Sequence, residues 1–277
     1  QILNLPSSSG NNVLLTCFKN LAMAQKGILA DKGLHHKQLG NNALWIDWDQ
    51  SSTVGTLLSD LYYAMGHIAL SQRYAFEGVI ASEWNAYLYL RLIQTNLIYG
   101  HYDVAEKYIR FLEDTRYEEQ AQAYRKFLYN DALVEQDKEL GGKRKGVSGN
   151  KSLSELKGLT NDLLQIAFAH PENRIVVEYV GMYILFERNI PLFKMFIENF
   201  YQAPGLQPMP THFQEAIVFS YENQPERWTE LGITETTQKR FEEFKRLSID
   251  AQLSPSLVNK LRSGFGYTYW YYYTHQK

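Results

Sequence analysis

Tyr63-Ala64-Met65-Gly66-His67-Ile68 recurs 34 residues later as Leu97-Ile98-Tyr99-Gly100-His101-Tyr102. The Gly-His pair is identical in the two stretches, and Tyr74 matches Tyr108 at the same offset. A period of this length is typical of arrays of helix–turn–helix units. Glycine also adopts the left-handed conformation that a tight turn between two helices requires. The pattern therefore predicts two stacked helical hairpins that turn at Gly66 and Gly100.

The rest of the chain also has a helical pattern. No proline occurs between Pro6 and Pro171, and apolar residues recur at helical spacing from Tyr87 to Ile98. We therefore expect an all-α fold, a right-handed α-α superhelix of antiparallel helix pairs. The residues from Phe265 to Tyr273 are nearly all aromatic, and we expect them to form an irregular tail that caps the stack or lies at a membrane interface.

Composition shifts divide the chain into three parts. We predict N-terminal helical repeats in residues 1–140, ending in a long polar helix over 117–140. Residues 141–151 contain four glycines and four basic side chains, which predicts a flexible loop. Residues 152–277 are expected to form C-terminal helical hairpins and a cap. The two helical parts could also form one continuous solenoid.

The overall charge and the cysteine content exclude several classes of protein. The 28 basic and 30 acidic residues give a formal net charge of −2, so the sequence indicates no nucleic-acid partner. One cysteine, Cys17, excludes an internal disulfide framework. No apolar run approaches the ~20 residues that span a bilayer.

Two resemblances follow from these motifs. Leu92, Gly100, Tyr102 and Ala105 resemble the consensus of tetratricopeptide repeats, which implies a helical scaffold. The segments 92–102, 170–174 and 265–272 resemble the soluble C-terminal part of an uncharacterised family of bacterial multi-pass membrane proteins. That resemblance implies a domain attached to a membrane region outside this chain and located in the periplasm.

A stack of helical hairpins presents an extended groove to a partner. The leading hypothesis is thus a non-enzymatic scaffold domain that binds a protein or peptide. We expect the first helix of each hairpin to line the groove, which gives four candidate contact residues: Tyr62, Tyr89, Arg91 and Asn96.

The alternative is an accessory glycan- or substrate-binding domain of a membrane-bound transferase. Trp45, Asp47, Trp48 and Asp49 lie close together in a segment between helices. Paired carboxylates beside an aromatic platform occur in sugar-processing sites. The competing interpretation is an ordered loop whose tryptophans pack on neighbouring helices.

No catalytic pattern was found elsewhere. The seven histidines lack the spacing of a helical zinc site, and there is no nucleophile elbow or dinucleotide-binding pattern. We therefore expect no metal, no cofactor and no enzyme activity. His67 and His101, which follow the two turn glycines, are expected to have structural roles.

Overall fold

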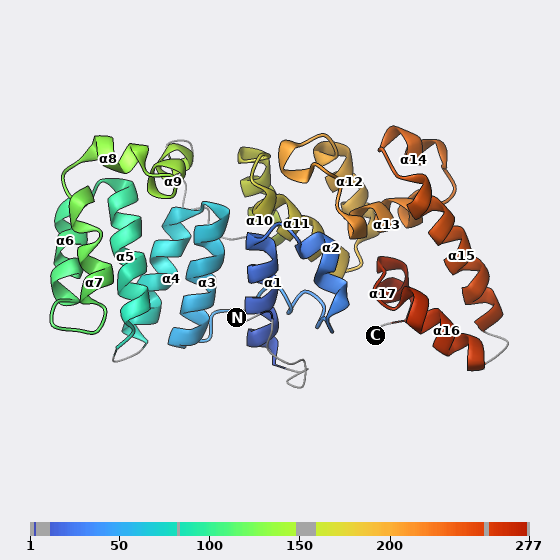
Figure 1. Ribbon diagram of the computed structural model, residues 1–277, viewed down its shortest axis with the longest axis horizontal. Coiled ribbons are helices and arrows are strands. Elements are labelled where there is room, and N and C mark those ends of the chain that lie inside the picture. The colour runs from blue at the N-terminus through green and yellow to red at the C-terminus, as the bar shows by residue number, and fades with distance from the viewer. Residues whose placement is uncertain (1–2, 4–11, 82–83, 148–158, 252–254, 276–277) are drawn as a thin grey trace. The chain divides into compact units, whose positions relative to one another are not determined.

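The computed structural model describes residues 3, 12–81, 84–147, 159–251 and 255–275, and their regular secondary structure is helical (Figure 1). The only β-type pairing among these residues is an isolated bridge between Leu39 and Asn41. The all-α prediction is confirmed. The chain forms two compact units, one of residues Gln1–Leu44 and Leu163–Lys277 and the other of Trp45–Asp162.

The division differs from the predicted split into residues 1–140 and 152–277. The first 44 residues belong to the same unit as residues 163–277, because buried contacts join them across the sequence. The Glu178 carboxylate, for example, accepts hydrogen bonds from the main-chain amides of Leu29 and Ala30 at 3.1 and 3.4 Å. Local sequence patterns carry no signal for such long-range pairing.

The Trp45–Asp162 unit contains the predicted hairpins. Its elements are α3 (Ser52–Met65), α4 (Ile68–Ile80), α5 (Ala86–Tyr99), α6 (Tyr102–Phe111), α7 (Glu118–Gln122), η4 (Arg125–Phe127), α8 (Asp131–Gln136) and α9 (Leu140–Val147). Helices α3 to α6 pack in sequence order, each against the next (Figure 1). One core of this unit includes Tyr63, Ile93, Leu97, Ala105 and Ile109.

The two turns of the predicted repeat have the same conformation. Gly66 has φ +87° and Gly100 has φ +76°, and each ends its helix in the left-handed region. The amides of His67 and His101 donate to the equivalent oxygens of Tyr62 and Asn96, both at 2.9 Å. Each histidine directly precedes the return helix, and the Nδ1 atom of His67 also accepts from the amide of Leu70.

A long helix over residues 117–140 was predicted, and this prediction is wrong. The segment is broken into α7, η4 and α8, with Tyr129 at φ +56° between the last two. The side chain of Asn130 accepts a hydrogen bond from the amide of Leu133 and so begins α8. An asparagine that caps a helix in this way competes with continuation of the preceding one.

The predicted flexible loop at 141–151 also needs correction. Residues up to Val147 belong to α9, and residues 148–151 lie outside the described part of the chain. The carboxylate of Asp137 accepts hydrogen bonds from the amides of Glu139 and Leu140 at 2.9 and 2.8 Å. This cap, together with tertiary contacts of Lys143 and Arg144, stabilises a helix that its glycines disfavour.

The other unit contains three N-terminal elements and a C-terminal series of helices. They are α1 (Val13–Gln25), α2 (Leu29–Lys32), η3 (Gly33–His35), most of α10 (Leu159–Ala169), α11 (Arg174–Phe186), α12 (Ile190–Phe200), η5 (Pro204–Leu206), α13 (Thr211–Ser220), α14 (Glu226–Glu230), α15 (Glu235–Ala251), α16 (Pro255–Phe265) and α17 (Tyr269–His275). Helix α11 is buried along nearly all of its length.

The aromatic C-terminal tail is not irregular. Its last part is α17, in which Tyr269 and Trp270 are fully buried. The amide of Tyr269 donates to the buried carboxylate of Glu215 at 2.8 Å, and the indole of Trp270 donates to the main-chain oxygen of Glu215 at 2.6 Å. Burial of these two rings against α13 holds α17 in place. The contact between α13 and α17 joins residues far apart in the sequence, so local patterns do not indicate it.

Candidate functional site

The strongest candidate site lies in the Trp45–Asp162 unit, where two cations face one aromatic ring. The guanidinium of Arg91 on α5 lies 3.5 Å from the centre of the Tyr63 ring, and the ammonium of Lys143 on α9 lies 4.3 Å from it. Tyr63 and Arg91 are buried, and Lys143 is half-buried. We call Tyr63, Arg91 and Lys143 the Arg91–Lys143 site.

Arg91 is held in place by neighbouring polar groups. Its Nη2 donates to the Asp60 carboxylate at 2.8 Å, and its Nη1 donates to the Gln94 side chain at 2.8 Å. The Tyr87 hydroxyl also donates to Asp60 at 2.8 Å, which orients the carboxylate. Among the described residues, Arg91 Nε has no hydrogen-bond partner. This donor is itself buried, so it is unsatisfied inside the unit and not exposed at its surface.

Lys143 is the less compensated of the two cations. Its ammonium donates to the main-chain oxygen of Tyr63 at 2.5 Å, and no ion pair joins it to a carboxylate of the described residues. Burial lowers the pKa of Lys143 to about 8; attraction by Glu139 opposes this change, and repulsion by Arg91 adds to it. A cation in this state gains stability from any anion that approaches it.

The four predicted groove residues do not form one surface. Tyr62 is fully buried, with its ring 5.6 Å from both Tyr74 and Trp45. Asn96 is also buried, and its amide donates to Leu92 O within α5 at 2.7 Å. Tyr62 and Asn96 are core residues, which corrects the prediction, because each hairpin packs its first helix more deeply than expected. Arg91 is the one that belongs to the candidate site.

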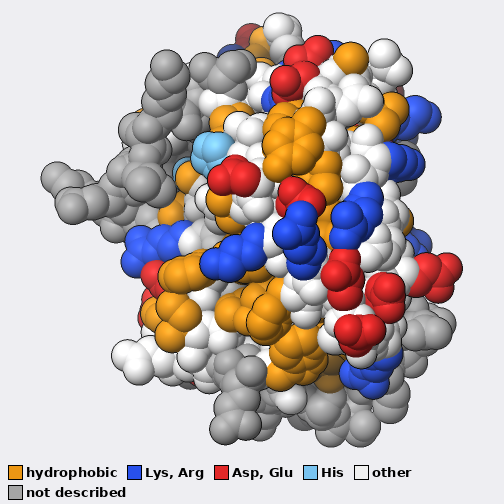
Figure 2. Space-filling view, turned by 90° about the vertical axis from the view of Figure 1, so that its left-hand side faces the viewer, with side chains coloured by type: hydrophobic (Ala, Val, Ile, Leu, Met, Phe, Trp, Pro, Cys, Tyr) orange, Lys and Arg blue, Asp and Glu red, His pale blue; other side chains and the backbone are white. Residues whose placement is uncertain are grey.

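Tyr89 belongs to a different surface. Its ring contacts Phe111 and Trp84, with ring centres 4.6 and 5.7 Å apart, and both neighbours are about half exposed. We call Trp84, Tyr89 and Phe111 the exposed aromatic cluster. The face of the molecule on the side of α6 and α7 carries hydrophobic areas beside a row of Lys and Arg side chains (Figure 2). Such surfaces are typical of contact sites.

The tryptophan segment is a loop, as predicted, and its contacts favour a structural role. Trp45 packs edge-on against Tyr62, and Trp48 lies 6.0 Å from the Tyr74 ring centre. The carboxylate of Asp47 accepts from the Trp45 indole at 3.4 Å. The carboxylate of Asp49 accepts from the amide of Ser51, just before α3, and hydrogen bonding to Ser51 lowers the pKa of Asp49. The two exposed carboxylates thus have local partners.

The described ranges contain neither a metal-binding cluster nor a membrane-spanning helix. No group of three His, Cys, Asp or Glu side chains there is placed to hold a metal ion. None of the described helices has the length and apolar content needed to cross a bilayer. The thiol of Cys17 is buried, donates to Asn42 O, and has its pKa raised to about 12 by burial, which makes it a poor nucleophile.

Sequence reasoning found Arg91 but missed Tyr63 and Lys143. Lys143 follows two glycines, a pattern that predicts a solvated loop, so nothing local indicated a buried ammonium. Tyr63 lies one turn before Gly66, and the sequence marks it only as part of the repeat. The signal that could have found the site is the repeat itself, because carbonyl oxygens at the end of each first helix can accept a further hydrogen bond from a basic side chain.

The comparisons with known proteins give a family but no activity. The chain belongs to a family of unknown function, DUF6057, whose model matches residues 1–276. Neither the curated proteins nor the solved structures contain a match to this chain.

Proposed function

We propose that this DUF6057 chain is a non-enzymatic helical-repeat scaffold domain. In this proposal the Trp45–Asp162 unit binds a protein or peptide partner that places an acidic side chain at the Arg91–Lys143 site. The equal turn geometry at Gly66 and Gly100 supports the tetratricopeptide-like, right-handed superhelical interpretation, which is part of the proposal. The observation that carries the partner chemistry is Lys143, a desolvated cation that lacks an ion pair among the described residues.

A carboxylate supplies the partner that the Lys143 ammonium lacks. Charge-assisted hydrogen bonds to a carboxylate are shorter and stronger than neutral ones, and a partly buried site screens them less than water does. The half-buried Lys143 ammonium offers donors beyond the one used by Tyr63 O. Both cations lie over the Tyr63 ring, at 3.5 and 4.3 Å from its centre, and the negative face of the ring attracts each of them.

The test is a peptide array in which each acidic peptide is printed beside a twin with Gln and Asn in place of Glu and Asp. The wild-type chain should retain acidic peptides that their neutral twins do not. Lys143→Gln should weaken the best of these about tenfold, in line with the ~1.5–3 kcal/mol of a charged hydrogen bond. Lys138→Gln, an exposed lysine before α9, is the matched control. Equal binding by Lys143→Gln and wild type would contradict the proposal.

We also propose that the domain works beside a membrane, in the periplasm, attached through a region outside this chain. The exposed aromatic cluster supports this proposal, since Trp, Tyr and Phe rings concentrate at membrane interfaces. Co-sedimentation with phosphatidylcholine vesicles should decrease when Trp84 and Phe111 are both replaced by Ala. The control is Tyr129→Ala, which removes an exposed ring elsewhere in the same unit. Glycan binding at the tryptophan loop has less support, because both tryptophans pack against helix side chains.

A further inference from the structure

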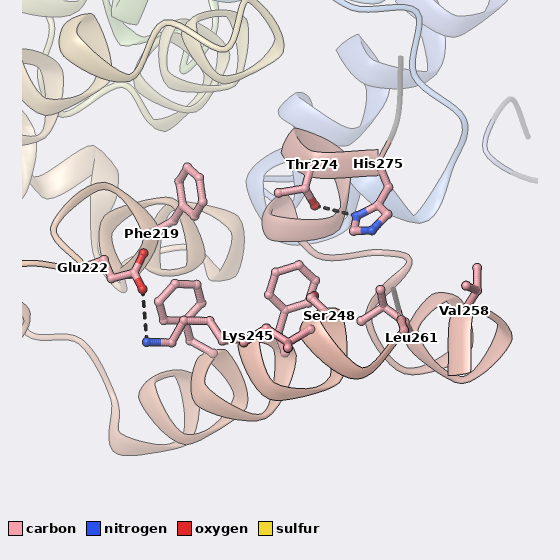
Figure 3. Close-up of a pocket in the computed structure, with 12 residues that line it drawn as sticks. Phe219, Glu222, Lys245, Ser248, Val258, Leu261, Thr274 and His275 are labelled. Atoms are coloured by element: carbon pink, nitrogen blue, oxygen red, sulfur yellow. Dashed lines mark hydrogen bonds and ion pairs between the residues drawn. The ribbon is translucent and has the colours of Figure 1, made fainter. Parts of the chain in front are cut away.

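A pocket of about 510 Å³ lies in the unit of Gln1–Leu44 and Leu163–Lys277, among α13, α15, α16 and α17. Its size is within the ~300–1,000 Å³ range of small-molecule sites. The walls are mainly apolar and are formed by Phe219, Phe241, Phe244, Ile249, Val258 and Leu261 (Figure 3). A site with these walls favours the hydrocarbon part of a ligand.

The charged groups at this pocket neutralise one another. Lys245 pairs with Glu222 at 3.2 Å (Figure 3). It also pairs with Glu242 at 2.9 Å. The hydroxyl of Thr274 and the Nδ1 atom of His275 are hydrogen-bonded to each other at 2.6 Å on another side of the pocket. The one lysine in the lining is thus already paired with carboxylates, and it offers no unpaired cation for the head group of a fatty acid.

One polar group in the lining is left over. The Oγ atom of Ser248 is buried and has no hydrogen-bond partner among the described residues. An unpartnered buried hydroxyl costs about 1–3 kcal/mol, so native structures nearly always provide a partner. A serine within a helix commonly bonds to a carbonyl of the preceding turn, and Ser248 on α15 does not. The Ser248 hydroxyl therefore has no hydrogen-bond partner among the described residues, and Ser248 lines the pocket.

We propose that this pocket binds an uncharged, largely hydrocarbon small molecule whose single polar group hydrogen-bonds to Ser248. The apolar walls favour a hydrocarbon ligand, the paired charges disfavour a charged one, and the Ser248 hydroxyl can accept or donate one hydrogen bond. A charged amphiphile would have to break the Lys245 ion pairs or leave its own charge uncompensated. The pocket shares no residue with the Arg91–Lys143 site and would bind a different kind of ligand. The two proposals can therefore be tested, and contradicted, independently.

The probe is N-phenyl-1-naphthylamine, a neutral fluorophore with one N–H donor whose emission rises in apolar surroundings. It should titrate to saturation with the wild-type chain. Val258→Phe narrows the pocket and should weaken binding about tenfold or more. Ser248→Ala keeps the volume and should weaken binding roughly two- to tenfold, the effect of one hydrogen bond. Met195→Phe, at an exposed position of the same unit, is the control.

Competition identifies the ligand class. Dodecanol should displace the probe at lower concentration than dodecanoate or dodecylamine. Circular dichroism melting of every variant verifies that the fold is intact. The proposal is overturned if the probe does not bind, if Val258→Phe and Ser248→Ala bind like wild type, or if dodecanoate is the better competitor. Lys143→Gln should leave probe binding unchanged.

Discussion

The main-chain oxygens of Tyr63 and Leu97, 34 residues apart, accept hydrogen bonds from adjacent side chains of α9. Lys143 donates to Tyr63 O at 2.5 Å, and Arg144 donates to Leu97 O at 2.7 Å. Both oxygens belong to the last turn of a first helix, and each also accepts from the amide of the turn glycine, Gly66 at 3.1 Å and Gly100 at 3.2 Å. Helix α9 thus donates hydrogen bonds to equivalent carbonyl oxygens of the two hairpins. The two donors belong to the basic segment that was predicted to be a flexible loop.

The turn glycines should be sensitive to a single methyl group. Gly66→Ala should lower the free energy of unfolding by about 1–2 kcal/mol, because an L-residue is strained in the left-handed region. No atom lies within 4 Å of the added Cβ, so the effect is purely conformational. Gly142→Ala is the matched control: it lies in α9 with open space around it, and it should raise stability by ~0.5–1 kcal/mol. Urea unfolding measures the change in unfolding free energy of each variant. The explanation is wrong if both variants are destabilised or both are stabilised.

Arg144 should stabilise the hairpins through main-chain contacts. Its guanidinium donates to Ile98 O at 3.0 Å and to Leu97 O, and it also pairs with Asp131. We expect Arg144→Ala to destabilise the chain by about 1.5–3 kcal/mol in urea unfolding, since charged donors at buried carbonyls are lost. Asp131→Asn removes the charge of the exposed ion pair but keeps the carbonyl contacts, so it should cost much less stability than Arg144→Ala. An equal loss of unfolding free energy in the two variants would show that the ion pair, and not the carbonyl contacts, is responsible.

Lys143 should make stability depend on alkaline pH. Its pKa falls from 10.5 in the unfolded chain to about 8 in the folded one, so the unfolded state binds more protons between these values. Stability contributed by this group therefore rises as pH increases from about 8 to 10.5. We expect the unfolding free energy of wild type, relative to that of Lys143→Met, to increase from pH 7.5 to pH 10. A difference that stays constant with pH would show that Lys143 is not desolvated.

Glu215 should hold α17 in place. One of its carboxylate oxygens accepts from the Tyr269 amide at 2.8 Å and lies 3.0 Å from His212 Nδ1. Glu215→Ala leaves these buried groups unpaired and should cost about 3 kcal/mol or more. The loss should appear in urea unfolding, together with a red shift of tryptophan emission as Trp270 becomes exposed. Glu226→Ala, an exposed residue in α14, should change neither quantity.

Much of the hairpin architecture could be predicted because it depends on local rules. The turn at Gly100 and the helix from Ala86 to Tyr99 involve residues within a few helical turns. The candidate site was predicted only at Arg91. Its other cation comes from a helix 52 residues further along the chain, and nothing near Lys143 in the sequence indicates which ring it will face.

Glycine conformation, helix caps and apolar spacing act over a few residues. The helical class, the 34-residue offset and the positions of the two turns therefore follow from the amino-acid sequence alone. Tertiary structure alone decided that residues 1–44 join residues 163–277, that α9 binds the ends of two hairpins, and that the aromatic tail becomes a buried helix. These outcomes depend on burial and on satisfaction of distant carbonyl, amide and charged groups, and such partners are chosen only when the chain is packed.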